Sequence, residues 1–148
     1  MTVAPERPVA ALRQGRDLVS PELFDRLTTF CADEYSLDAG MAARIMDEAL
    51  AFLYVAGTTE REHIMAPSRA VDPAWHTFML HTQEYAAWCE QHFGRYLHHA
   101  PNSKTRTRGL MYDVTDAITA AGFAVDKSLW GIAADCNEPT CCSDGPCC

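Results

Sequence analysis

The 148-residue chain has little of what marks a nucleic-acid-binding or a membrane protein. Its 12 basic residues are outnumbered by 20 acidic ones, which gives a formal net charge of −8. Because binding to polyphosphate or anionic lipid depends on a concentrated positive field, neither nucleic acid nor a membrane surface is an expected partner. The longest apolar run, residues 49–57, is far shorter than the roughly 18 residues that a membrane-spanning helix needs.

Two further absences concern the cellular location of the protein and the reactions it could catalyse. The N-terminal stretch lacks the run of about 7–15 apolar residues that characterises a secretory signal. We therefore expect the chain to reside in a reducing cytoplasm, where its seven cysteines would not persist as structural disulfides. Neither the HExxH zinc helix nor the Gly-x-Ser-x-Gly nucleophile elbow is present, so the sequence does not support hydrolase chemistry.

Apolar residues make up 48% of the chain, and they recur at helical spacing without the alternation of strands. Capping residues, prolines at first helical positions and terminal glycines set the expected boundaries. They predict helices that begin at Ser20, run from Asp38 to Gly57, run from Asp72 to Gly94, occupy about residues 106–121, and form a short lid after Asp126.

The chain is thus predicted to be all-α, a single-domain bundle of four to five helices with a flexible cysteine-rich C-terminal tail. Residues 1–19, which contain prolines and a glycine without sustained periodicity, are expected to form an irregular lead-in. Residues 20–134 then form the helical domain, and residues 135–148 form the tail.

Five of the six histidines lie between His76 and His99, so a metal or catalytic site is one hypothesis for this segment. His76 and His81 are five residues apart, which separates them by about 140° around a helix. They cannot readily share an ion without ligands from other helices. Cys89 and His92 have the i,i+3 spacing of paired ligands and could supply half of a mixed thiolate–imidazole site.

The same residues also have structural interpretations. Cys89 lies in the apolar stripe of its expected helix, which favours a buried role as a small hydrophobic residue. His98 and His99 follow the expected end of that helix at Gly94. There an imidazole can bond the terminal carbonyl groups, and we favour this role over metal ligation.

The stretch VDPAWHTFMLHT at residues 71–82 continues to Tyr85, Cys89, Phe93-Gly94 and a histidine pair. It resembles the helical segment of the glycine-rich domain-containing proteins, and the match covers about residues 71–101. The resemblance implies a small bacterial member with a helical fold and no established active site. Its motif positions are Trp75, His76, Tyr85, Cys89 and Gly94. The chain departs from the larger proteins in lacking a glycine-rich region and in ending with a cysteine tail.

That tail has the pattern C-x4-CC-x4-CC, with prolines and a glycine that prevent a helix. Thiolates are soft donors that select Zn²⁺ or Cu(I), and four of them satisfy tetrahedral zinc. The pattern predicts soft-metal binding, delivery or sensing, without turnover, by the tail cysteines Cys136, Cys141, Cys142, Cys147 and Cys148.

Two alternatives stay open. The helical domain could bind a protein partner while the tail is a substrate for modification or for thiol redox chemistry. The chain could instead be a metalloenzyme that uses the histidine-rich third helix. The candidate residues of this second metal site are His76, His81, Cys89, His92, His98 and His99.

Overall fold

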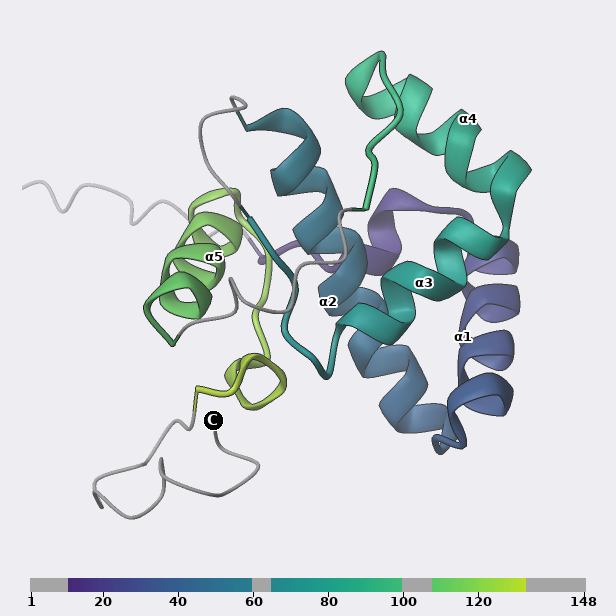
Figure 1. The fold of residues 1–148 in the computed structure, drawn as a ribbon, viewed down its shortest axis with the longest axis horizontal. Coiled ribbons are helices and arrows are strands. Elements are labelled where there is room, and N and C mark those ends of the chain that lie inside the picture. Colours follow the sequence, from purple (N-terminus) through teal and green to yellow (C-terminus); the bar gives the residue numbers. More distant parts are fainter. Residues whose placement is uncertain (1–10, 60–64, 100–107, 133–148) are drawn as a thin grey trace, which may run out of the picture.

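The computed structural model describes residues 11–59, 65–99 and 108–132. Within these ranges the regular elements are helices, with η denoting a 3-10 helix (Figure 1). The predicted all-α bundle of four to five helices is confirmed for this part of the chain. In chain order the elements are η1 (Gly15–Leu18), α1 (Pro21–Tyr35), α2 (Ala39–Thr58), α3 (Asp72–Leu80), α4 (Thr82–Phe93), α5 (Arg108–Ala120) and η3 (Lys127–Trp130).

The first two long helices begin where the sequence predicts. The Ser20 hydroxyl accepts the backbone N–H of Leu23 at 3.2 Å, and the Asp38 carboxylate accepts that of Met41 at 2.7 Å. Each bond satisfies an amide that the first turn of a helix leaves without an intrahelical partner. Every helix in the described ranges is too short or too polar to span a lipid bilayer.

Helix α2 lies at the centre of the core, as its apolar sequence predicts. Figure 1 shows α1, α3 and α4 on one side of it and α5 with η3 on the other. Phe52 of α2 is fully buried. Its ring lies 5.6 Å from Trp75 of α3 and 5.9 Å from Trp130 of η3, measured between ring centroids. A single α2 side chain therefore contacts both sides of the molecule.

The prediction of one continuous helix from Asp72 to Gly94 is wrong. The helix breaks at His81, whose φ of −83° and ψ of 67° are not helical. In a straight helix Trp75 and Tyr85 would lie about 15 Å apart along the axis, at about 1.5 Å per residue. The break instead brings the Trp75 indole Nε1 to 3.0 Å from the Tyr85 hydroxyl. A buried tertiary hydrogen bond therefore compensates for the interrupted helix.

The two glycines expected to end helices behave differently. Gly94 adopts a φ of 65° directly after α4, in the left-handed region that L residues rarely enter, so its predicted role is confirmed. Gly57 lies inside α2, which continues to Thr58, so its predicted role as a helix end is wrong. A Cβ at position 57 would overlap the ring of Phe93. Gly57 therefore serves the close approach of α4 to α2.

Of the irregular lead-in expected for residues 1–19, the structure describes residues 11–19. From residue 11 onward the chain is tied to the domain, since Arg13 exchanges two backbone hydrogen bonds with the turn after α5, at 2.9 Å and 2.8 Å. The carbonyl of Leu18, at the end of η1, accepts the indole N–H of Trp88 at 3.0 Å. Residues 11–19 therefore belong to the folded unit.

Candidate metal centre

Three side chains converge at the start of α3. The Nε2 atom of His99 lies 2.8 Å from Oδ1 of the Asp72 carboxylate, and the Nε2 atom of His76 lies 3.4 Å from Oδ2 of the same carboxylate. The two Nε2 atoms are 3.2 Å apart. All three side chains thus place a nitrogen or oxygen atom around one point, and all three residue types are metal ligands.

Two elements supply these donors. Asp72 and His76 are four residues apart on α3, and this spacing places both side chains on one face of the helix. His99 comes from the segment that follows α4, after the chain has turned at Gly94. The Trp75 ring lies 4.2 Å from the His99 ring, between centroids, and supports it over α3.

Asp72 was expected to cap its helix, and this prediction is wrong. No side chain caps α3, and Val71 occupies the N-cap position. The Asp72 backbone N–H is already bonded to the Ser68 carbonyl at 2.9 Å. The Asp72 carboxylate instead lies within 3.4 Å of the two imidazole Nε2 atoms. The capping interpretation expected His99 to bond the carbonyl groups at the end of α4. Its Nε2 atom instead contacts Asp72 of α3.

Protons alone do not satisfy this arrangement. A carboxylate only accepts hydrogen bonds, and each Nε2 atom carries either one N–H or one lone pair. If both ring nitrogens carry protons, the His76–His99 contact joins two donors. If either nitrogen lacks its proton, a lone pair faces the Asp72 carboxylate. No assignment of protons therefore makes all three contacts hydrogen bonds.

A cation at the centre would satisfy all three lone pairs at once. Zinc binds imidazole nitrogen and carboxylate oxygen at about 2.0–2.2 Å, so neighbouring donors in a tetrahedral site lie about 3.3 Å apart. The two imidazole Nε2 atoms, 3.2 Å apart, lie close to this value. Their contacts of 2.8 and 3.4 Å with Asp72 are made to different carboxylate oxygens, and one ligand atom from each of the three residues lies within 4.8 Å of the others. The three residues are therefore close enough for each to offer one ligand atom to a single ion.

One edge of the site faces solvent. The side chains of His99 and Asp72 are 9% and 15% exposed, whereas that of His76 is 44% exposed. An ion held by these three donors would therefore keep coordination positions on the His76 side for water or for a ligand from solution. This is the arrangement of catalytic zinc sites, whereas structural sites are closed by four protein donors.

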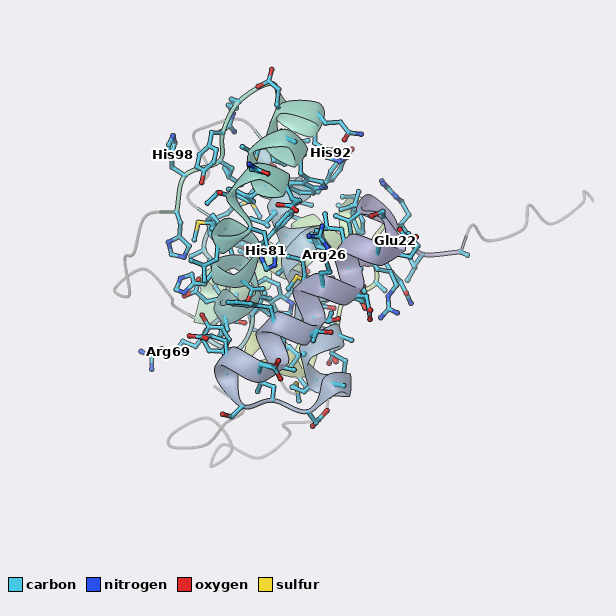
Figure 2. All side chains as sticks on the ribbon, turned by 90° about the vertical axis from the view of Figure 1, so that its right-hand side faces the viewer. Glu22, Arg26, Arg69, His81, His92 and His98 are labelled. Atoms are coloured by element: carbon cyan, nitrogen blue, oxygen red, sulfur yellow. The ribbon has the colours of Figure 1, made fainter. Side chains whose placement is uncertain are left out.

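The other histidines predicted as candidates lie elsewhere, and Figure 2 shows His81, His92 and His98 at separate places. His81 bonds the Thr77 carbonyl through Nδ1 at 2.8 Å and packs edge-on against Phe30. His98 is exposed and stacks beside Tyr96. Neither side chain reaches the three converging donors.

His92 and Cys89 are packed among core residues and lie apart from the three converging side chains. The His92 ring lies 4.8 Å from that of Trp88, and burial lowers the pKa of the imidazole. Its buried Nε2 atom has no hydrogen-bond partner within the described residues. Cys89 is fully buried, and burial raises the pKa of its thiol, which disfavours the thiolate that a metal requires. The tail cysteines, Cys136 to Cys148, lie outside the described residues.

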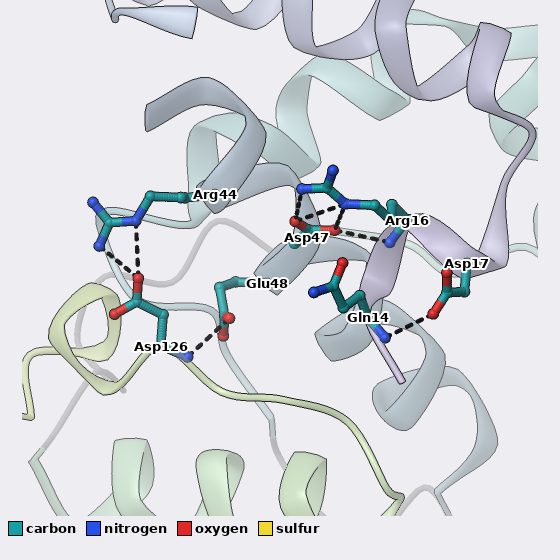
Figure 3. Close-up of polar contacts among 7 residues, drawn as sticks. All are labelled: Gln14, Arg16, Asp17, Arg44, Asp47, Glu48 and Asp126. Carbon is teal, nitrogen blue, oxygen red and sulfur yellow. Dashed lines mark hydrogen bonds and ion pairs between the residues drawn. The ribbon is translucent and has the colours of Figure 1, made fainter. Parts of the chain in front are cut away.

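A second polar cluster lines an open cavity of about 580 Å³ between α2 and the segment before η3. Its central carboxylate is Glu48, which is 5% exposed. One Glu48 oxygen accepts the backbone N–H of Asp126 at 2.9 Å, and the other accepts the indole N–H of Trp130 at 2.7 Å. Figure 3 shows that the neighbouring carboxylates, Asp47 and Asp126, each pair with an arginine. Within the described part of the chain, each of these three carboxylates therefore has a hydrogen-bond or ion-pair partner.

Asp72 is the site residue that sequence reasoning missed. Its position directly before a proline resembles that of a capping residue. The spacing of the histidines was compared only with that of other histidines and of Cys89. The signal that could have found it is the spacing Asp-x-x-x-His between Asp72 and His76, which predicts a shared helix face. The contribution of His99 depends on the turn after α4 and has no counterpart in the local sequence.

The three converging side chains lie in a part of the chain that matches a known family. A family model described as UCP032817-like matches residues 18–111, a range that includes all three converging side chains. No curated protein and no solved structure matches the chain. The resemblance to the glycine-rich domain-containing proteins stays a prediction.

Proposed function

This chain belongs to the UCP032817-like family, and we propose that it binds a divalent transition-metal ion through Asp72, His76 and His99. The observation that supports the proposal is the mutual contact of the three side chains, which no distribution of protons turns into three hydrogen bonds. Two imidazoles and one carboxylate suit Zn²⁺, Fe²⁺ or Co²⁺, whereas Cu(I) prefers thiolates.

The tail cysteines belong to the same proposal as a second, softer donor set. A reducing cytoplasm would keep them as thiols, available to Zn²⁺ or Cu(I). The chain would then carry a nitrogen and oxygen site in its domain and a thiolate site in its tail. Both are compatible with metal delivery or sensing.

The decisive experiment separates the two donor sets in the full-length chain. The variant with all five tail cysteines changed to serine is titrated with Zn²⁺ by calorimetry and with Co²⁺ by absorption spectroscopy. We expect one ion per chain. His76→Ala in this background should weaken binding by at least about 100-fold, because even changes outside the ligand set cost about 10–100-fold.

His98→Ala is the matched control, because it removes an imidazole one residue from His99 that does not face the site. It should bind as tightly as the parent. The proposal is wrong if the tail variant takes up no ion, or if His76→Ala binds as tightly as its parent. A wild-type chain that binds no more ions than the tail variant would contradict the thiolate site alone.

The exposed edge at His76 favours a second candidate function, a metal-dependent enzyme. An ion with open coordination positions can activate water or bind a substrate. Azide added to the Co²⁺-loaded protein should shift the visible absorption bands if such a position exists. Bands that azide leaves unchanged at saturation would show a closed site and would remove this candidate.

A further inference from the structure

The Tyr85 hydroxyl connects the two elements that supply the metal donors. Its ring is fully buried, and burial raises the pKa of Tyr85, so the hydroxyl keeps its proton. It accepts the indole N–H of Trp75 at 3.0 Å and donates to the carbonyl of Leu97 at 2.6 Å. The same oxygen is thus bonded to α3 and to the segment after α4.

Both of these partners adjoin the site. Trp75 precedes His76, and its ring packs on His99 at 4.2 Å between centroids. Leu97 precedes His99 by two residues, a span of at most about 7 Å of chain. Fixing the Leu97 carbonyl therefore fixes where the His99 backbone can lie. Trp75 then limits the ring of His99 from one side.

We infer that Tyr85 is a positioning residue, which holds His99 against Asp72 and His76 and so sets the affinity of the site for Zn²⁺. This inference rests on the proposed function. The break at His81 makes this role possible, since a straight helix would carry Tyr85 about 15 Å along the axis from Trp75. The position of the His99 imidazole thus depends on the helix break at His81, on the buried Tyr85 hydroxyl and on the turn at Gly94.

The test is Tyr85→Phe, which removes the hydroxyl and leaves the aromatic ring in the core. In the tail-serine background we expect Zn²⁺ affinity to fall by about 10–100-fold, the usual cost of losing a group that orients a ligand. The matched control is Glu48→Gln, which is also isosteric and also alters the acceptor of a buried indole N–H, but on the other side of α2. It should leave Zn²⁺ affinity unchanged.

A second measurement needs no metal. The Trp75 ring should shift the proton resonances of the His99 imidazole, because it lies within ring-current range. Tyr85→Phe should move these resonances toward the values of an exposed histidine, whereas Glu48→Gln should not. Circular dichroism confirms that both variants remain helical.

The outcomes are distinct. If the parent binds Zn²⁺ and Tyr85→Phe binds within 2-fold of it with unchanged His99 resonances, the inference is wrong and the metal site stands. If the parent binds no ion, the proposed function fails, and the inferred control of affinity fails with it. In that case the His99 resonances alone decide whether Tyr85 positions the ring. Equal losses of affinity in Tyr85→Phe and Glu48→Gln would show a general effect on the core and would overturn the inference.

Discussion

Two tryptophans contact Phe52, and the polar groups beside them differ. The indole N–H of Trp130 is bonded to Glu48, and the indole N–H of Trp75 is bonded to Tyr85. At Trp130 the carboxylate completes the cluster, because each of its oxygens accepts one N–H. Near Trp75 the Asp72 carboxylate instead faces two ring nitrogens that also face each other.

The difference is the reason for proposing a metal site at Asp72 and a purely structural role for the cluster around Glu48. Both regions contain buried or half-buried ionisable groups close to an indole ring, so neither burial nor composition separates them. What separates them is whether one distribution of protons satisfies every contact. Around Glu48 it does, and the cluster joins α2 to η3. Around Asp72 it does not, and a cation would supply what is missing.

The largest expected effect comes from removing the residue that both regions share. Phe52→Ala leaves a cavity between Trp75 and Trp130 and should lower the free energy of unfolding by about 3–5 kcal/mol. Urea denaturation followed by circular dichroism measures it. Leu12→Ala, at a side chain that is 62% exposed, is the control and should change stability by less than about 0.5 kcal/mol. A small loss for Phe52→Ala would mean that the two sides of α2 do not depend on this contact.

Glu48→Gln should have the next largest effect on stability. A glutamine keeps one acceptor oxygen and turns an N–H₂ group toward one of the two N–H donors, so one buried bond is lost. We expect a loss of about 1–3 kcal/mol in the free energy of unfolding at pH 7. If urea denaturation shows no loss, the cluster around Glu48 is not the structural link inferred from its hydrogen bonds.

The pH dependence of stability should carry a smaller signal from the same carboxylate. Desolvation by burial, with the nearby carboxylates of Asp126 and Asp47 acting in the same direction, raises the pKa of Glu48. The folded chain therefore binds this proton more tightly than the unfolded chain, whose glutamate pKa is about 4.3. The contribution to stability grows as pH falls from the raised pKa toward that value and is lost as pH rises.

The difference in unfolding free energy between wild type and Glu48→Gln isolates this group from the other titrating residues. Measured by urea denaturation at a series of pH values, the difference should shift in favour of wild type as the solution becomes mildly acidic. A difference that is flat between neutral and mildly acidic pH would show that Glu48 is not titrating with a raised pKa.

The smallest effect should come from His98→Ala. His98 is exposed, so its removal should change the free energy of unfolding by less than about 0.5 kcal/mol. Its neighbour His99 is a proposed ligand, so the pair contrasts a surface imidazole with a site imidazole. A stability change above about 1 kcal/mol on thermal or urea denaturation would show that the contact of His98 with Tyr96 supports the segment after α4.

The sequence predicted much of the fold because the deciding signals are local. Ser20, Asp38 and Gly94 have the chemistry that helix ends require, and the structure confirms these three. The helix break at His81 could not be predicted in the same way, since neither glycine nor proline marks it. The hydrogen bond between Trp75 and Tyr85 that accompanies the break forms only when α3 and α4 pack against each other.

The candidate site was only partly predictable, because local sequence signals identify possible ligands but not the tertiary contacts that bring them together. His76 and His99 were among the predicted ligands, but a continuous helix gave no means of bringing them together. Asp72 was assigned to a cap because its local context favours one. The convergence of the three residues depends on tertiary contacts made by Tyr85 and Leu97.

Because Trp75 and Tyr85 are hydrogen-bonded across the break at His81, the number of residues between them should not be able to change. Inserting or deleting one residue between Thr82 and Tyr85 would turn the tyrosine by about 100° around α4 and shift it by about 1.5 Å. Substitutions at the exposed positions of that turn should be tolerated, but changes in its length should not. Relatives that keep the arrangement should therefore vary here in residue type while keeping ten residues from tryptophan to tyrosine.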